Sequence, residues 1–281
     1  MSAAAETDAT DHIGQAIAGG VFRSICETAA SRFGVVPDVH PDDFIFRFLL
    51  GNTSFTDPDH AVHYYFEDAA RSAERLRGLL YDRCGLSRAP FDLLEFAAGY
   101  GCLTRHLGNA LPDCTVTSCD IHTNALVFLR ERLGVPVLAS HTVPERLVSE
   151  RSFDAVFALS FFSHMPARTF TRWMRALASL VRPGGFLIFT TQGLVTRDKY
   201  WGNTRLDRHG FHFLPDSEQK DLAAAEYGTT LASPYYVFNA ARSLGNLRPR
   251  MFEEGFWWTH QDVYVLQVST ELYRGGRLYV G

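Results

Sequence analysis

Cysteine is scarce in this sequence and is not arranged in pairs. The 281 residues include 5 cysteines, an odd number, and none of them forms a C-x-x-C motif. A full disulfide framework is therefore excluded, and a zinc ribbon, whose ligands come in closely spaced pairs, is not indicated. We infer a reducing compartment and expect a cytoplasmic protein.

Long apolar runs and a dominant charge are also missing. No segment approaches the roughly eighteen consecutive apolar residues of a membrane helix, and residues 1–12 are polar and acidic, unlike a signal peptide. The formal net charge is −4, with acidic and basic residues mixed along the chain. This balance indicates no surface for nucleic acid or anionic membrane. We expect a small-molecule substrate and neither of those partners, and a homodimer stays open.

Two hydrophobic patterns divide the chain near residue 90. Residues 12–90 mostly show the three- and four-residue spacing of amphipathic helices, so we predict a helical N-terminal cap at 1–90. Within it, residues 40–60 break the rhythm with proline, glycine and asparagine. We predict a loop between helices at that place.

From residue 91 onward, short apolar runs alternate with helical stretches, as in βαβ units. The candidate strands are FDLLEF, CTVTSCD, VPVLAS, FDAVFALS and GFLIFTT, followed later by RMFEEGFWWTH and DVYVLQV. We predict an α/β fold for residues 91–281. It is a Rossmann-like, mostly parallel seven-stranded sheet with helices on both faces and an antiparallel last strand.

The connection after the fifth strand is too long for an ordinary crossover. Residues 233–245 are expected to form the last crossover helix, and residues 193–232, approximately, an insertion rich in tyrosine, histidine and aspartate. Long insertions at the carboxyl ends of strands commonly carry substrate contacts. We therefore expect a substrate to bind this insertion.

A glycine turn follows the first predicted strand. Glu95 ends the strand, and Gly99 and Gly101 stand where glycine accepts positive φ and lets a ligand approach the backbone. Asp120 ends the next strand, nineteen residues after Gly101, where a carboxylate can bind both hydroxyls of a ribose. Each feature alone would equally fit a tight turn or a helix cap. Together they predict a nucleoside site.

Spacing and charge favour one kind of nucleoside. The dinucleotide pattern G-x-G-x-x-G needs a glycine where the chain has Thr104. Glu95 would repel a pyrophosphate but suits the ammonium group of a methionine moiety. We predict S-adenosylmethionine as the cofactor. The alternatives are a non-catalytic nucleoside-binding scaffold and, less favoured, an NAD-dependent oxidoreductase.

These motifs resemble those of class I S-adenosylmethionine-dependent methyltransferases. The family's acid-x-Gly-x-Gly-x-Gly motif matches the stretch from Glu95 to Gly101, except that Ala97 replaces the first glycine. Asp120 matches the acid of the second motif, and the Arg-Pro-Gly-Gly turn expected before the fifth strand, at 182–185, is also typical. The resemblance implies methyl transfer and the cofactor contacts of this fold.

Further cofactor contacts follow from the same resemblance. It implies that Ile121 packs on the adenine and that Ser140 or His141 lies beside the adenine edge. We also expect Ser160 and Tyr65 to contact the cofactor. Several segments, LSFFSHMP and HQDVYVL among them, resemble bacterial methyltransferases of glycan biosynthesis. That narrower resemblance implies O-methylation of a sugar or oligosaccharide hydroxyl.

His164 is the candidate catalytic base. It lies just past the fourth predicted strand, and the unperturbed imidazole pKa of about 6.5 allows a neutral ring to accept a proton. A base next to a sugar hydroxyl could accelerate transfer roughly a hundred- to ten-thousandfold. A helix cap or packing against the adenosine is an equal alternative for this histidine.

The predicted substrate contacts lie in three segments. His260, Gln261 and Asp262 follow two tryptophans, a combination that suits the apolar faces and polar edge of a sugar ring. The other predicted contacts are Glu226, Tyr227 and Tyr64. Tryptophan pairs are more often core, and buried tyrosines often serve structural hydrogen bonds.

A divalent metal such as magnesium is conceivable, because some sugar methyltransferases are metal-assisted. Asp207, Glu226 and Asp262 offer the hard oxygen ligands that such ions prefer. Nothing in their spacing brings them together, so we predict no metal site.

Overall fold

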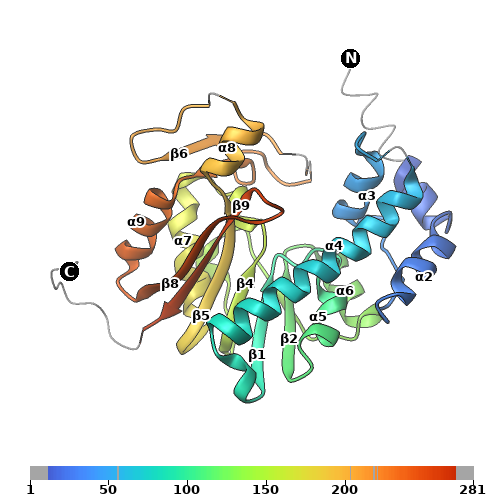
Figure 1. Cartoon of the computed structure of the whole chain (residues 1–281), viewed down its shortest axis with the longest axis horizontal. Coiled ribbons are helices and arrows are strands. Elements are labelled where there is room, and N and C mark those ends of the chain that lie inside the picture. Colours follow the sequence, from blue (N-terminus) through green and yellow to red (C-terminus); the bar gives the residue numbers. More distant parts are fainter. Residues whose placement is uncertain (1–11, 56, 203, 218, 220, 270–281) are drawn as a thin grey trace. The chain divides into compact units, whose positions relative to one another are not determined.

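The structure, a computed structural model, describes residues 12–55, 57–202, 204–217, 219 and 221–269 (Figure 1). The main sheet has the strand order β3 (Val137–Ala139), β2 (Cys114–Asp120), β1 (Phe91–Phe96), β4 (Phe153–Ala158), β5 (Val181–Gln192), β9 (Gln261–Val268) and β8 (Leu247–Trp257). β9 pairs antiparallel with both β5 and β8, while β4 pairs parallel with β1 and β5. The predicted Rossmann-like sheet with an antiparallel last strand is confirmed.

Contacts within the chain define two compact units. The first comprises residues up to 90 together with 97–140, and the second comprises 91–96 together with residues from 141 onward. The division at residue 90 into a cap and a core remains a prediction. In the part of the chain that the structure describes, no helix has both the length and the apolarity that a membrane crossing requires.

The first unit is mainly helical. Its elements are α2 (Arg23–Ser31), α3 (Phe44–Gly51), α4 (Pro58–Gly78), the π-helical η1 (Leu79–Arg83), η2 (Leu86–Arg88), α5 (Thr104–Ala110), β2 (Cys114–Asp120), α6 (Thr123–Arg132) and β3 (Val137–Ala139).

Helix α3 corrects the prediction of a loop at residues 40–60. The Asp43 side chain caps this helix by accepting a hydrogen bond from the backbone N–H of Phe46 at 3.1 Å. Phe46 and Leu49 are buried, so one face of the helix packs into the unit. A cap and an apolar face outweigh the turn residues that flank the segment.

The second unit holds the other strands of the sheet. Its elements are β1 (Phe91–Phe96), η3 (Pro144–Arg146), β4 (Phe153–Ala158), η4 (Phe161–Ser163), α7 (Ala167–Ser179), β5 (Val181–Gln192), α8 (Leu194–Tyr200), β6 (Phe211–Leu214), β7 (Thr229–Ala232), α9 (Pro234–Leu244), β8 (Leu247–Trp257) and β9 (Gln261–Val268).

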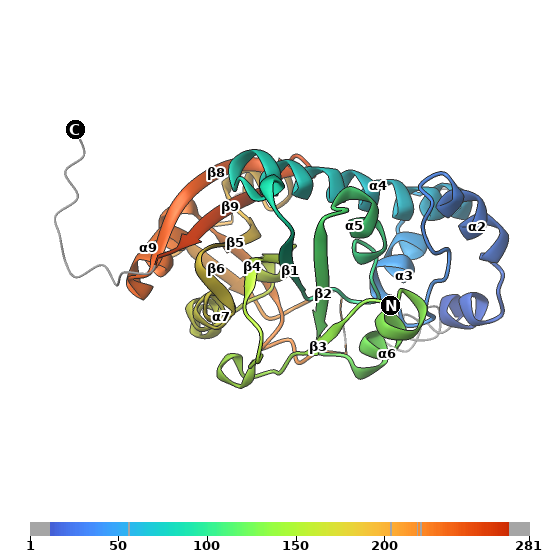
Figure 2. The ribbon, with the colours of Figure 1, turned by 90° about the horizontal axis from the view of Figure 1, so that it is seen from below.

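Helices α7 and α9 of this unit pack against each other, and they contact β5 and β8 respectively (Figure 2). Residues 155–158 of β4 are fully buried, as are residues 263–266 of β9. Such unbroken burial is expected for central strands that are covered on both faces. Within the predicted insertion, β6 and β7 form a separate antiparallel pair that the sequence pattern did not reveal.

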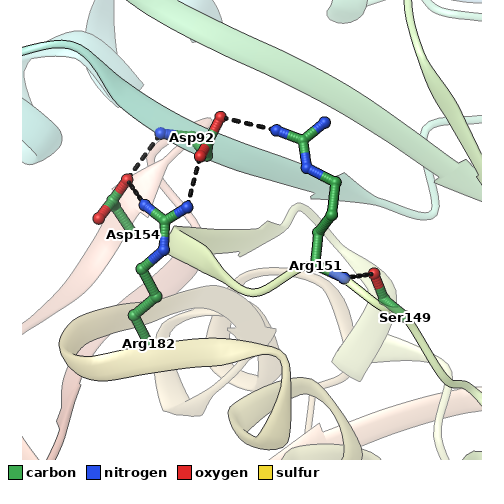
Figure 3. A network of polar contacts seen from close by, with 5 residues as sticks. All are labelled: Asp92, Ser149, Arg151, Asp154 and Arg182. Carbon is green, nitrogen blue, oxygen red and sulfur yellow. Dashed lines mark hydrogen bonds and ion pairs between the residues drawn. The ribbon is translucent and has the colours of Figure 1, made fainter.

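The Arg-Pro-Gly-Gly motif lies inside β5, at an irregularity in its pairing with β4, rather than before the strand. Arg182 donates hydrogen bonds to the carboxylates of Asp154 and Asp92, both at 2.5 Å (Figure 3). Asp92 also pairs with Arg151 at 3.1 Å. A side chain at Gly185 would press on the backbone oxygen of Asp154. The motif therefore fastens the beginnings of β1, β4 and β5 together.

Candidate functional site

The turn after β1 has three residues in the left-handed region. Ala97 has φ 59°, Gly99 has φ 55° and Gly101 has φ 78°. This conformation is easy for glycine but costs an alanine on the order of 1 kcal/mol. Ala97 thus keeps the backbone path that a glycine would take, at a cost in strain.

The two glycines of the turn have different surroundings. A Cβ atom at Gly99 would meet nothing within 4 Å, so the backbone there borders open space. A Cβ atom at Gly101 would overlap the side chains of Leu129 and Leu133. Gly101 is therefore required for packing against α6, whereas Gly99 leaves room for a ligand.

Asp120 is held rigidly behind this turn, in the same unit. One carboxylate oxygen accepts the backbone N–H of Gly99 at 2.7 Å. The other accepts the backbone N–H of His122 at 2.9 Å and contacts its ring Nδ1 at 2.8 Å. A carboxylate has about four acceptor positions, so capacity for a ligand hydroxyl remains. Sequence reasoning missed His122, although its place two residues after Asp120 was a usable signal.

The other predicted contacts of the first unit are Ser140, Ile121 and Tyr64, whereas His141 belongs to the second unit. Ser140 donates its backbone N–H to the backbone oxygen of Asp120 at 2.8 Å, and Ile121 is partly buried directly after β2. His141 is used locally, because its Nδ1 accepts the N–H of Val143 at 2.9 Å. Tyr64 is partly buried. Their roles as cofactor or substrate contacts stay predictions.

Tyr65 belongs to a buried hydrogen-bond network. Its hydroxyl donates to Asp43 at 2.7 Å and accepts from Arg105 at 3.2 Å. Arg105 in turn donates to the backbone oxygen of Gly101 at 3.1 Å. Burial raises the pKa of Tyr65 well above its ordinary value, so this hydroxyl stays protonated. The network ties α3 and α4 to the glycine turn.

In the second unit, a closed hydrogen-bond triangle joins the ends of β4 and β5 to the start of β9. Ser160 donates its N–H to the Thr190 hydroxyl at 2.8 Å, and Thr190 donates to the side-chain oxygen of Gln261 at 2.7 Å. The Gln261 amide donates to the Ser160 hydroxyl at 2.9 Å. Ser160 has φ 58°, a strained value for a non-glycine residue. Thr190 lies in the segment FTTQG, which resembles methyltransferases of glycan biosynthesis, but the sequence analysis gave it no role. Glu95, the predicted partner of the methionine ammonium group, also belongs to this unit and is buried in β1.

His164 directly follows η4 and is held by the predicted insertion. Its Nδ1 lies 2.8 Å from the backbone oxygen of Gly228. Its ring stacks on that of Tyr227, with centroids 4.4 Å apart and an interplanar angle of 8°. Burial lowers the pKa of His164 to about 4, although the bond to Gly228 opposes this shift. The imidazole is therefore neutral near pH 7.

The aromatic side chains near His260 are not the two neighbouring tryptophans that the sequence suggested. Trp257 is fully buried and packs against Phe157, so it belongs to the core. Trp258 forms the β8–β9 turn with a φ of 51°. The ring of His260 lies 6.2 Å from that of Trp258 and 5.2 Å from that of Tyr200, which is 65% exposed. The accessible aromatic surface is therefore formed by Trp258, His260 and Tyr200.

Asp262 is fully buried at the beginning of β9. Its Oδ1 accepts the backbone N–H of Gly255 at 3.0 Å, while Oδ2 has no hydrogen-bond partner among the described residues. Burial raises the pKa of Asp262 to about 7. Oδ2 fills the space that a side chain at Gly193 would need. This glycine therefore makes room for the carboxyl group.

The three carboxylates considered as metal ligands are engaged separately. Asp207 accepts backbone N–H groups of His209 and Phe211, Glu226 pairs with Arg168, and Asp262 is bound as described. Across the described ranges, no group of three or more histidine, cysteine, aspartate or glutamate side chains is placed to hold a metal ion.

Part of this chain is similar to known proteins. Residues 94–187 match a family model described as a methyltransferase domain. This stretch, about a third of the chain, is therefore similar to methyltransferase domains. The predicted enzyme class is thereby confirmed for the stretch that contains the glycine turn, Asp120 and His164. No curated protein shows a significant sequence match to the chain.

Solved structures of methyltransferases have a fold similar to that of this chain. An S-adenosylmethionine-dependent methyltransferase from Clostridium acetobutylicum has a TM-score of 0.53 at 14% identity, covering 76% of this chain and 100% of that one. The 1,6-didemethyltoxoflavin-N1-methyltransferase of Burkholderia thailandensis has a TM-score of 0.50 at 16% identity, covering 72% of this chain and 78% of that one. An O-methyltransferase family protein of the same organism has a TM-score of 0.50 at 15% identity, covering 80% of this chain and 63% of that one. At these identities the likeness establishes the fold alone.

Proposed function

We propose that the chain transfers a methyl group from S-adenosylmethionine to a hydroxyl group of a small molecule, with a saccharide as the acceptor class. The observation that carries the cofactor assignment is the Asp120 carboxylate. Gly99 and His122 orient it, and the open space at Gly99 adjoins it. This arrangement suits a ribose, whose paired hydroxyls need an oriented acceptor.

The residues present fit the rest of this cofactor. In the first unit, Asp120 would hold the ribose, and Ile121 and Ser140 would adjoin the adenine. In the second unit, Glu95 has the charge that suits a methionine ammonium group. When bound, S-adenosylmethionine supplies an electrophilic methyl group on a sulfonium. The chain's own contribution is to orient the acceptor and to exclude water.

His164 is assigned to deprotonate the acceptor hydroxyl. A carbonyl oxygen can only accept, so the contact with Gly228 requires the proton on Nδ1 and leaves a lone pair on Nε2. The low pKa keeps this lone pair free at neutral pH. A neutral imidazole can therefore accept the hydroxyl proton as the acceptor oxygen is methylated.

The saccharide assignment is supported by the surface of Trp258, His260 and Tyr200. Sugar rings have apolar faces that stack on aromatic side chains, and hydroxyl edges that need polar partners. Backbone strain at Trp258, which keeps this bulky residue at a φ of 51°, is typical of positions retained for binding.

The decisive experiment has two stages. Calorimetric titration of S-adenosylmethionine, S-adenosylhomocysteine and NAD into the protein should show binding of the first two only. Transfer of a labelled methyl group would then be measured over a panel of sugars, each paired with its deoxy analogue. Loss of labelling with one deoxy analogue identifies the acceptor oxygen. Binding of NAD alone would overturn the proposal, and cofactor binding without labelling of any sugar would overturn the acceptor class.

A further inference from the structure

A short segment of the insertion, Glu226–Thr230, grips His164 from several sides; we call it the clamp segment. The contact with Gly228 is reciprocal, because Gly228 donates its N–H to the backbone oxygen of His164 at 3.0 Å while its own oxygen meets Nδ1 at 2.8 Å. The backbone and the ring of one histidine are thus bound by one glycine. These two contacts fix the orientation of the imidazole ring.

The clamp segment is attached on both sides of this contact. The Thr230 hydroxyl donates to the backbone oxygen of Met165 at 2.7 Å. Arg168 pairs with Glu226 and donates to the backbone oxygen of Ala225 at 2.9 Å. The exposed ion pair adds little by itself, but the buried Thr230 bond anchors the segment next to the histidine.

Gly228 is placed by the β6–β7 hairpin. A Cβ atom at this position would overlap the backbone oxygen of Leu214 and the ring of Phe213, both at the end of β6. Only glycine lets the chain pass so close to β6 while presenting its carbonyl to His164. The hairpin therefore sets the position of the hydrogen-bond acceptor.

Tyr227 covers one face of the imidazole by stacking on it. Charged groups have little part in this environment. The charged residues are Arg168, Arg172 and Arg175 in α7 and Glu226 in the clamp segment. The lowered pKa of His164 results from burial, and no charged neighbour contributes to it.

We infer that the clamp segment is a positioning element for the base, in which Gly228 fixes the Nδ1–H tautomer and Tyr227 keeps the ring desolvated and neutral. This inference rests on the proposed function, since it gives the insertion a role in transfer beyond binding the acceptor. It assigns Tyr227 a position beside the base rather than a contact with the substrate.

The test combines nuclear magnetic resonance with a rate profile. Nitrogen-15 shifts of His164 in the full chain, with no acceptor present, should show the Nδ1–H tautomer and a pKa of about 4. Tyr227→Leu exposes the ring, and its pKa should rise toward the ordinary value of about 6.5. At pH 6 the neutral fraction, and with it kcat/KM, would then fall about fourfold. Tyr227→Phe, which keeps the stacked ring, should leave the pKa of His164 at about 4.

His164→Asn separates the clamp from the base. The asparagine amide can still donate to Gly228 from the position of Nδ1, but it has no group in the place of Nε2. The fold and cofactor binding should persist while kcat falls about a hundredfold or more. An Nε2–H tautomer in the wild type, or an unchanged pKa in Tyr227→Leu, would overturn the inference even if the enzyme is active. Full activity of His164→Asn would instead overturn the base assignment made above.

Discussion

The cofactor turn of the first unit and the His164 edge of the second differ in how far apart along the chain their partners lie. Gly99 and Asp120 are 21 residues apart, and every bond at that carboxylate forms within one β-α-β stretch. His164 and Gly228 are 64 residues apart, and Ser160 and Gln261 are 101 apart. One site is a local motif, whereas the other exists only after the insertion and the last strand have packed.

Under the proposed roles, this difference separates cofactor binding from methyl transfer. The local site needs only the turn, β2 and the start of α6, so its geometry is largely set by nearby residues. The distant site depends on long loops, whose closure costs entropy and whose contacts form late. We therefore expect changes at the first site to alter affinity, and changes at the second to alter stability and turnover together.

The largest expected effect on the local side of the comparison is that of Asp120→Ala. It removes a carboxylate held by several charge-assisted hydrogen bonds, and S-adenosylmethionine affinity should fall about a hundredfold, equivalent to roughly 3 kcal/mol. Titration calorimetry measures this loss. Asp113→Ala, an exposed aspartate just before the same strand, should leave the affinity unchanged. Equal affinity of Asp120→Ala and wild type would remove Asp120 from the cofactor site.

Gln261→Leu tests the hydrogen-bond triangle of the second unit, whose partners are far apart in the sequence. It leaves the Thr190 and Ser160 hydroxyls without their partner in a buried place, which should lower the free energy of unfolding by about 2–3 kcal/mol. Urea denaturation would measure this. Gln267→Leu, on the same strand but with exposed hydrogen bonds to Arg250 and Gly184, should cost less than about 1 kcal/mol. Similar losses in both variants would contradict a special role for the triangle.

Asp262→Asn tests whether the Asp262 carboxyl group makes the free energy of unfolding depend on pH. Because burial raises the folded-state pKa of Asp262 to about 7, the folded protein binds an extra proton in weakly acidic solution. This contribution is complete below about pH 4 and is lost as the pH rises through 7. Between pH 5 and pH 8 the wild type should therefore lose about 2 kcal/mol of stability from this group. In the variant that loss should be absent, and parallel pH profiles of the two proteins would refute the assignment.

The smallest effect is expected at Ala97. Replacing it by glycine relieves a left-handed alanine but frees the unfolded chain, so Ala97→Gly should stabilise the protein by at most about 1 kcal/mol. Ala98→Gly, at the next position, where φ is not positive, should instead destabilise it by about 0.5–1 kcal/mol. Thermal denaturation distinguishes the signs, and destabilisation by both changes would show that the Ala97 conformation carries no strain.

Sequence patterns predicted what local forces decide. The strand runs, the glycine turn and the acid at the end of β2 all follow from hydrophobic spacing and from the special freedom of glycine. The α3 helix was missed because turn residues on both sides masked an apolar octapeptide with a good cap. The β6–β7 pair was missed because its strands are only four residues long.

In the site around His164, the sequence pointed to some of the residues but not to their hydrogen-bond partners. His164 could be singled out by its place after a strand, and Gln261 by the polar run around it. Their partners, Thr190 and Gly228, are residues that occur everywhere in sequences and gain meaning only from what they touch. The same holds for Trp257 and Trp258, adjacent in the chain, of which one lies in the core and the other forms the turn.

The bridge from Arg182 to Asp92 and Asp154 has a consequence for classification. One cation holds two anions at the beginnings of the strands, so loss of Arg182 would leave Asp154 without this ion pair and Asp92 with Arg151 alone, whether or not any methyl group is ever transferred. The Arg-Pro-Gly-Gly motif therefore has a structural role in this chain that does not depend on catalysis. It is no evidence of activity, which has to be judged from residues such as His164.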